Sequence, residues 1–244
     1  MGFVIGALMG GLFALLLIYV HETLKISQFI LGITLVILGT GLSDLLYKII
    51  IGVQLFAPEA PPVPVVDIPV LSNIPILGAV FNQDVIVYFT YFAVFVAYYI
   101  FYHTRAGLET RAIGEDPKAA DVVGINVTLR RYIATITGGM LMGIAGAYLP
   151  LVITGTYTTN ISNGRGFMAI GIAIFASWRP ERAYLGAFIF AAIEVLSFQQ
   201  QLGSSMFPYQ FLLMMPFISV LVIMWLFRKK VEFPAALGKA YSRE

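Results

Sequence analysis

Two acidic side chains interrupt long apolar stretches of this 244-residue sequence. Asp44 lies near one end of the apolar segment 26–47, and Glu194 lies deeper in the segment 184–200. An ionised carboxylate at the centre of a bilayer costs at least about 2.5 kcal/mol, so it faces a cavity, a partner or the membrane interface. The position of Asp44 favours the interface, whereas that of Glu194 favours a cavity or a buried pair. In a transporter, either carboxylate could line a solute path or bind a coupling cation.

A polar stretch, TGTYTTNISNGRG at 154–166, separates two apolar segments. Irregular backbone at membrane depth is tolerated only where protein or water covers it, and in transporters such breaks often mark the substrate route. An ordinary loop outside the membrane explains the composition equally well. Asn160 and Asn163 therefore join Asp44 and Glu194 as candidate residues of a translocation path.

Motifs for enzymatic chemistry are absent from the sequence. No GxxxxGK[ST] phosphate loop, HExxH zinc motif or GxSxG nucleophile turn occurs. The chain has no cysteine, and its two histidines, His21 and His103, are too far apart in sequence for metal-ligand spacing. We therefore predict no catalytic residue, no metal site and no cofactor in this chain, and an ATP-driven process would need a separate nucleotide-binding subunit. The net charge of +2 is too small to indicate a nucleic-acid partner.

The composition predicts the elements that must hold these polar groups. Hydrophobic residues make up 59% of the chain and charged residues 11%, whereas soluble domains average about 25% charged residues. A bilayer-spanning helix needs about 20 mostly apolar residues. Seven segments are candidates: 2–20, 26–47, 85–103, 132–153, 166–178, 184–200 and 209–227. We predict an all-α protein, a polytopic membrane helical bundle in one domain over residues 1–244. Its first segment is a retained helix and not a signal peptide, and its short fifth segment suits a broken or re-entrant element.

Glycines repeat at every fourth residue in two of these segments. Gly2, Gly6 and Gly10 lie in the first segment, and Gly139 and Gly143 lie in the fourth. Small residues at this spacing allow helix backbones to approach closely in lipid. The pattern predicts tight helix packing, either within one subunit or across a dimer.

The basic residues predict the orientation, because cytoplasmic loops of membrane proteins collect Lys and Arg. Seven alternating spans place 13 of the 15 basic residues on one side and leave only Lys48 and Arg165 on the other. The connection 104–131 and the tail 228–244 are then cytoplasmic, together with the C-terminus. The Pro-rich connection 48–84 lies outside, where repeated prolines predict an ordered loop with little secondary structure.

The cytoplasmic connection contains signals for a short helix. Asp116 suits the N-cap, Pro117 the first helical position, and Gly124 the left-handed residue after the end. A lipid-binding loop would be one-sidedly basic, but here acidic and basic side chains mix around a small apolar stripe. The stripe consists of Ala119, Val122, Val123 and Ile125. The helix is therefore either a docking element for a protein or a structured loop with no partner.

Two longer stretches carry a family resemblance. They are RAIGEDPKAADVVGINVTLRRYIATITGGMLMGIAGAYL at 111–149 and GRGFMAIGIAIFASWRP at 164–180. Both resemble the permease subunits of bacterial and archaeal ABC importers, most of all the branched-chain amino acid, simple-sugar and nucleoside permeases. In that family the first stretch contains a coupling helix, which inserts into a cleft of the ATP-hydrolysing subunit. The resemblance implies these coupling residues: Glu115, Asp116, Pro117, Ala119, Ala120, Gly124 and Ile125.

The resemblance also implies partners and a location. The partners would be an ATP-binding subunit that holds ATP and Mg²⁺, a second permease subunit, identical or paralogous, and an extracytoplasmic solute-binding protein. The location would be a prokaryotic cell membrane. Such permeases usually carry an additional N-terminal stretch before the part that matches here, so we expect the N-terminal part of the family pattern to be missing. The predicted position of Met1, outside the cell, agrees with that expectation.

Two function classes follow from these observations. The first is the permease subunit of an ATP-driven importer, for a nucleoside or simple sugar first and a branched-chain amino acid next. The second is a secondary transporter driven by an ion gradient, with Asp44 or Glu194 as its coupling carboxylate. A structural membrane subunit without a path is a weaker third. The capped helix favours the importer, because an ion-coupled carrier has no need of a docking helix.

Overall fold

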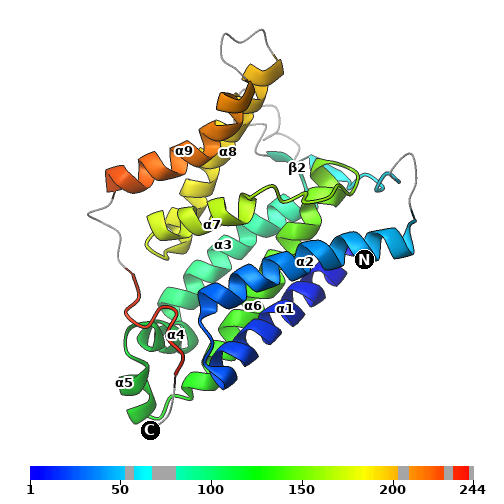
Figure 1. The fold of residues 1–244 in the computed structure, drawn as a ribbon. Coiled ribbons are helices and arrows are strands. Elements are labelled where there is room, and N and C mark those ends of the chain that lie inside the picture. Colours follow the sequence, from blue (N-terminus) through cyan, green and yellow to red (C-terminus); the bar gives the residue numbers. More distant parts are fainter. Residues whose placement is uncertain (53–57, 68–80, 203–208, 228–232, 242–244) are drawn as a thin grey trace. The chain divides into compact units, whose positions relative to one another are not determined.

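The computed structural model describes residues 1–52, 58–67, 81–202, 209–227 and 233–241. Within these ranges the chain is almost entirely helical, which confirms the predicted class, and a helix occurs at each of the seven predicted positions (Figure 1). The helices are α1 (Gly2–Leu24), α2 (Gln28–Ile50), α3 (Val85–His103), α4 (Arg105–Glu115), α5 (Pro117–Val122), α6 (Val127–Tyr148), η2 (Leu149–Ile153), α7 (Arg165–Phe175), α8 (Pro180–Leu202) and α9 (Tyr209–Phe227). The two strands are β1 (Val65–Asp67) and β2 (Asn82–Asp84).

Among the described residues, five helices are long and apolar enough to cross a membrane. They are Gly2–Leu24, Gln28–Ile50, Val85–His103, Val127–Ile153, which joins α6 and η2, and Pro180–Gln201. A further apolar helix, Arg165–Phe175, is shorter, and in α9 the apolar stretch found among the described residues is Gln210–Ile223. The chain is thus a multi-pass membrane protein by composition and helix length, and the predicted count of seven crossings is not confirmed. The outer faces agree with a lipid environment, since Phe29, Ile50 and Phe95 are 76%, 77% and 70% exposed.

The described chain divides into two compact units. Unit 1 consists of Met1–Phe89, Arg105–Asn163 and Ala235–Glu244, and unit 2 consists of Thr90–Thr104 and Gly164–Pro234.

Unit 1 is built on the packing of α1 against α6 (Figure 1). A methyl group added to Gly6 would lie 2.7 Å from the carbonyl oxygen of Gly143 and 2.8 Å from Cβ of Ala147. A methyl group added to Gly10 would lie 2.8 Å from Cα of Gly143. The two backbones therefore touch without intervening side chains. The predicted tight packing is confirmed, and it lies within one chain.

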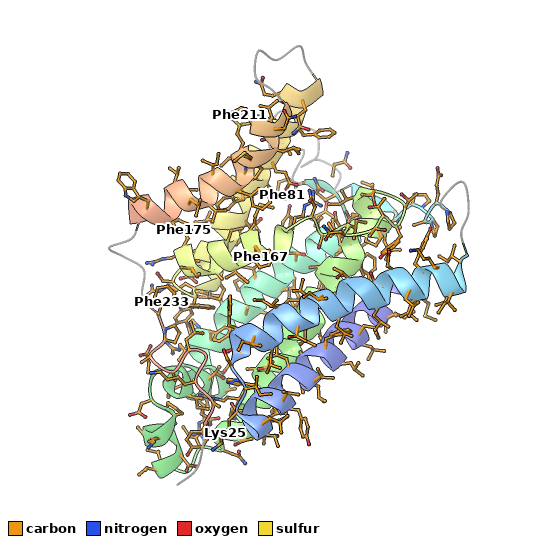
Figure 2. All side chains as sticks on the ribbon, in the orientation of Figure 1. Lys25, Phe81, Phe167, Phe175, Phe211 and Phe233 are labelled. Atoms are coloured by element: carbon orange, nitrogen blue, oxygen red, sulfur yellow. The ribbon has the colours of Figure 1, made fainter. Side chains whose placement is uncertain are left out.

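The turn between α1 and α2, which contains Lys25, brings α2 alongside α1 (Figure 2). Lys25 ends α1 in the left-handed conformation, with φ of 54°. The His21 ring hydrogen-bonds through Nδ1 to the carbonyl oxygen of Ile26 at 2.8 Å, and His21 is buried. One ring nitrogen of His21 is thus used by the turn between the two helices.

At the opposite end of α6 a small hairpin packs against the helix. β1 and β2 pair antiparallel, with Val66 opposite Gln83. Asp84 is buried and caps α3, accepting from the backbone N–H of Ile86 at 2.9 Å, and its other oxygen accepts from the Tyr148 hydroxyl at 2.7 Å. The rest of the predicted loop 48–84 lies largely outside the described residues.

Unit 2 contains most of α3 together with α7, α8 and α9. Gly186 of α8 packs on α7, where a methyl group would lie 3.0 Å from Cγ2 of Ile172. The Ser197 hydroxyl donates to the Leu212 carbonyl at 3.2 Å and joins α8 to α9. Pro216 lies inside α9, and its carbonyl accepts from the Ser219 hydroxyl at 2.6 Å. Hydroxyl groups thus satisfy backbone carbonyls in apolar surroundings, where water is scarce.

Candidate functional site

The short helix α5 has well-defined caps at both ends. The Asp116 side chain accepts from the backbone N–H groups of Lys118 at 2.9 Å and Ala119 at 3.1 Å, and Pro117 occupies the first turn. At the other end Gly124 adopts φ of 90°. The N–H of Ile125 donates to the Ala120 carbonyl at 3.1 Å, and the N–H of Gly124 donates to the Asp121 carbonyl at 2.9 Å. This pattern is a Schellman motif, so the predicted caps are confirmed.

One side of α5 packs inside unit 1. Ala120 is only 5% exposed and forms a cluster with Ile113 of α4 and Val127 of α6. Ile125 and Tyr241 pack against the same cluster. We expected the Ala120 methyl to lie on the docking face, but it points into its own subunit. Spacing alone could not reveal this, because α4 and α6 cover that side of the helix.

The other side of α5 is open. Val122 is 88% exposed and Val123 is 81% exposed. The described part of the chain leaves these two adjacent apolar side chains uncovered, and they form an apolar tip next to Gly124. A protein surface is a suitable partner for such a tip. Among the predicted coupling residues, Glu115, Asp116, Ala119 and Gly124 are also exposed, whereas Pro117 and Ile125 are half-buried.

A buried ion pair joins the last turn of α1 to the beginning of α6. Arg131 Nη1 donates to Glu22 Oε1 at 2.7 Å, and these side chains are 14% and 6% exposed. The same nitrogen donates to the backbone carbonyl of Lys239 at 2.8 Å, and Glu22 Oε2 accepts from the backbone N–H of Tyr241 at 3.1 Å. Sequence reasoning missed this pair, because its members lie 109 positions apart and no local pattern links them.

Asp44 joins α2 to the segment that follows η2. Its Oδ1 accepts from the Thr159 hydroxyl at 2.8 Å, and its Oδ2 lies 3.5 Å from Lys48 Nζ. The neighbouring Tyr157 hydroxyl lies 2.6 Å from the Ser43 hydroxyl, and its ring stacks on Tyr47 at 4.6 Å. These contacts give the polar stretch 154–166 a fixed place on the end of α2.

Asn160 and Asn163 form a tight turn in that stretch. Both adopt positive φ, 56° and 40°, and the N–H of Asn163 donates to the carbonyl of Asn160 at 2.9 Å. Asparagine tolerates the left-handed conformation better than most residues. Both side chains are exposed. Their residue type is therefore explained by the turn, and a place on a solute path stays a prediction.

Glu194 of α8 is paired with a basic residue that the sequence reasoning did not select. Arg165, at the start of α7, donates through Nε at 3.1 Å and through Nη2 at 2.6 Å to Glu194 Oε1. The two side chains remain 37% and 43% exposed. A half-exposed ion pair on apolar helices requires water or a polar partner nearby. Glu194 lies in unit 2, whereas Asp44, Asn160 and Asn163 lie in unit 1, and a common place for these four residues on a solute path stays a prediction.

No metal centre is formed by the residues that the structure describes. Across those ranges, no three or more His, Cys, Asp or Glu side chains gather in a group that could hold a metal ion. The chemistry available in this part of the chain is ion pairing, hydrogen bonding and the presentation of an apolar tip.

Comparisons with known proteins agree with one another. The family model described as "Branched-chain amino acid transport system / permease component" matches residues 1–227. The chain is 33% identical over 206 residues to the putative glucose ABC transporter permease protein TsgC13 of Haloferax volcanii, covering 82% of this chain and 61% of that protein. It is 32% identical over 179 residues to the nucleoside ABC transporter permease protein NupC of Lactococcus lactis, covering 72% of this chain and 56% of that protein.

A third relative is matched along nearly the whole chain. The guanosine ABC transporter permease protein NupQ of Bacillus subtilis is 30% identical over 240 residues, which cover 95% of this chain and 74% of that protein. The matched region thus spans about 60% of the length of the first two relatives. No solved structure matches the chain.

Proposed function

The chain belongs to the family of permease components of branched-chain amino acid transport systems, and on that premise we propose that it is the membrane-spanning subunit of an ATP-driven importer. It forms part of the translocation path for a small polar solute. A separate subunit binds ATP and Mg²⁺, and α5 transmits the work of ATP hydrolysis to the membrane helices. The observation that carries the coupling assignment is the capped helix α5 with its exposed tip of Val122 and Val123.

The solute is a nucleoside or a simple sugar, with a branched-chain amino acid as the next choice. The names of three relatives support this order, since they are a putative glucose, a nucleoside and a guanosine ABC transporter permease protein. The assembly contains a second permease subunit, identical or paralogous, and a solute-binding protein outside the cell membrane. It lies in a prokaryotic membrane, as expected from relatives in archaea and bacteria.

Seven crossings with a cytoplasmic C-terminus give the arrangement that best fits the charges. The contacts within unit 1 support this proposal. Lys25, Arg130, Arg131 and Lys239 gather with α4 and α5 at one end of α1 and α6. Lys48, one of the two basic residues assigned to the outside, lies at the other end with Asp44. This distribution agrees with the rule that basic residues collect on the cytoplasmic side.

An ion-coupled carrier is the less suitable alternative. Such a carrier needs a carboxylate that takes up and releases a cation during transport. Asp44 and Glu194 are the two candidates, and each already lies against a basic side chain, at 3.5 Å from Lys48 and 2.6 Å from Arg165. Transport in sealed vesicles that depends on a proton gradient and not on ATP would favour this alternative.

The test of the coupling assignment is Val122→Arg in the full complex. Because Val122 is 88% exposed, the substitution should leave the thermal stability of the permease unchanged. The arginine would have to lose water on docking without a matched counter-charge, which weakens an interface. We expect the ATP-binding subunit to be lost in a pull-down and the uptake of radiolabelled guanosine and glucose to fall to background.

The matched control is Leu108→Arg on α4, where the leucine is 61% exposed. It adds the same charge to an exposed apolar position of the neighbouring helix, and we expect it to keep the ATP-binding subunit. If Val122→Arg also keeps that subunit and full uptake, α5 is not the coupling element. Uptake of guanosine, glucose and leucine by the parent complex assigns the solute class in the same assay.

A further inference from the structure

The C-terminal segment, residues 235–241, contacts α1, α4 and α6 and packs on the cluster that contains Ala120 of α5. It follows the last apolar helix and belongs to unit 1. Its backbone makes three hydrogen bonds to the rest of the unit. The N–H of Ala236 donates to the Gly114 carbonyl at 3.0 Å, the Lys239 carbonyl accepts from Arg131, and the N–H of Tyr241 donates to Glu22. The segment is therefore bound by specific polar contacts and does not simply cover an apolar face.

Each of these bonds ends on a different element. Gly114 is in the last turn of α4, two residues before Asp116, the cap of α5. Arg131 is in the first part of α6, and Glu22 is near the end of α1. The Tyr241 side chain also packs on the cluster that contains Ala120 of α5. The segment is thus in contact with the coupling helix at one side and with the pair α1 and α6 at the other.

The charged groups at the centre of this arrangement are nearly buried. Glu22 is 6% exposed and Arg131 is 14% exposed. A buried charge is costly when part of its hydrogen-bonding capacity is unused, so the bonds to the segment matter for the pair as well. Arg131 Nη1 bonds to both Glu22 and Lys239, and the two Glu22 oxygens are divided between Arg131 and Tyr241. Neither side chain can satisfy these contacts if the segment moves away.

We propose that residues 235–241, held by Glu22 and Arg131, act as a strut that positions α5 against α1 and α6 during transport. This proposal rests on the function proposed above. α5 has only six residues, and a helix of that length cannot keep its position without tertiary contacts. The Ala120 cluster fixes one side of α5, and the strut holds the last turn of α4 at Gly114, two residues before the N-cap Asp116. A movement imposed on α5 by a partner is then passed to α1 and α6 rather than absorbed locally. Glu22 and Arg131 are positioning residues in this scheme and have no contact with solute or nucleotide.

Exchanging the charges of Glu22 and Arg131 distinguishes the proposed strut from an ion pair that only holds α1 against α6. In the double variant Glu22→Arg/Arg131→Glu, the attraction between α1 and α6 is kept. However, an arginine cannot accept from the N–H of Tyr241, and a glutamate cannot donate to the carbonyl of Lys239. The double variant therefore restores the ion pair and omits the two bonds to the segment. The second variant is a deletion of residues 235–244, and its matched control is a deletion of residues 242–244, which keeps every contact named above.

The measurement is solute transported per ATP hydrolysed by the reconstituted complex, with radiolabelled guanosine and glucose as probes. We expect the charge exchange and the long deletion to retain the ATP-binding subunit and to hydrolyse ATP. Their transport per ATP should fall about tenfold, the scale of a typical coupling free energy between two sites. The short deletion should match the parent. A purely structural role would instead lower protein yield and thermal stability while leaving this ratio unchanged.

Two results would contradict the proposal that residues 235–241 act as a strut. One is a charge-exchange variant with the parent ratio, which would mean that only the pairing of α1 with α6 matters. The other is a long deletion that inserts, binds the ATP-binding subunit and transports normally. Should the long deletion fail to insert, the charge exchange alone decides. Both outcomes are distinct from failure of the proposed function, in which the parent complex itself shows no ATP-dependent uptake or Val122→Arg has no effect.

Discussion

Gly10 of α1 and Gly143 of α6 are in backbone contact. A methyl group added to Gly143 would lie 3.0 Å from Cα of Gly10 and would meet the carbonyl oxygen of Gly6 even more closely. No rotation of a side chain can relieve such a contact, since the neighbours are backbone atoms. The α1–α6 interface therefore depends on the absence of side chains at these positions.

Substitution of this glycine should separate the two helices. We expect Gly143→Leu to lower the free energy of unfolding by at least about 1–3 kcal/mol, the usual cost of overpacking, and to abolish uptake. Thermal unfolding of the purified permease and solute uptake measure the two effects. Gly146→Leu is the control on the same helix, because a methyl group there would have nothing within 4 Å. Equal stability of the two variants would contradict the close packing.

The N-cap of α5 should contribute to coupling only in part. Asp116→Ala removes the acceptor for the N–H groups of Lys118 and Ala119. Loss of such a cap costs about 0.5–2 kcal/mol of local helix stability, so we expect reduced transport with the ATP-binding subunit still bound. Asp116→Asn should restore most of the transport, since asparagine is an equally good N-cap. If Asp116→Ala and Asp116→Asn are equally impaired, the negative charge and not the cap is what matters.

The ion pair between Arg165 and Glu194 should matter for transport more than for expression. Glu194→Gln leaves Arg165 without its counter-charge on an apolar helix surface, so we expect uptake to fall while the amount of membrane-inserted protein stays near that of the parent. The double variant Arg165→Gln/Glu194→Gln removes both charges and tests the pair as a unit. Normal uptake by the double variant would show that no solute contact depends on either side chain.

The orientation can be tested directly, because the chain contains no cysteine. We expect a single cysteine at Lys118 to be protected from an impermeant thiol reagent on intact cells and to react after the cells are opened. A single cysteine at Glu59 should react on intact cells. Both positions are exposed, so access depends on the side of the membrane. Labelling at residue 118 and not at residue 59 on intact cells would reverse the proposed topology.

Local signals in the sequence were sufficient for α5 and for the positions of the long helices. Asp116, Pro117 and Gly124 act through neighbouring backbone groups, so their residue types alone predict where the helix begins and ends. Apolar length likewise predicts membrane helices without knowledge of their neighbours. The glycine repeats likewise predicted close helix packing from local spacing alone. Only the structure showed that the packing lies within one chain and not across a dimer.

Contacts between distant elements could not be predicted in this way. The burial of Ala120 depends on Ile113 and Val127, which belong to two other helices. Glu22 and Arg131 are ordinary charged residues near helix ends until the fold brings them to 2.7 Å. Asp84 is different, because an aspartate directly before an apolar helix is a recognisable cap, and closer attention to that signal would have found its contact with Ile86.

The continuity of α6 and η2 has a mechanical consequence. Together they run without interruption from Val127 to Ile153, about 40 Å at 1.5 Å per residue. Along α1 this helix packs backbone against backbone, because Gly139 and Gly143 have no side chains to separate the two helices. We therefore expect a displacement at the start of α6, near Asn126, to move Tyr148 at its other end, 22 residues along the helix. The π-helical turn Leu149–Ile153 follows directly, and because π-helical turns are rare and less regular than the α-helix, we expect any bending of this long helix to occur there.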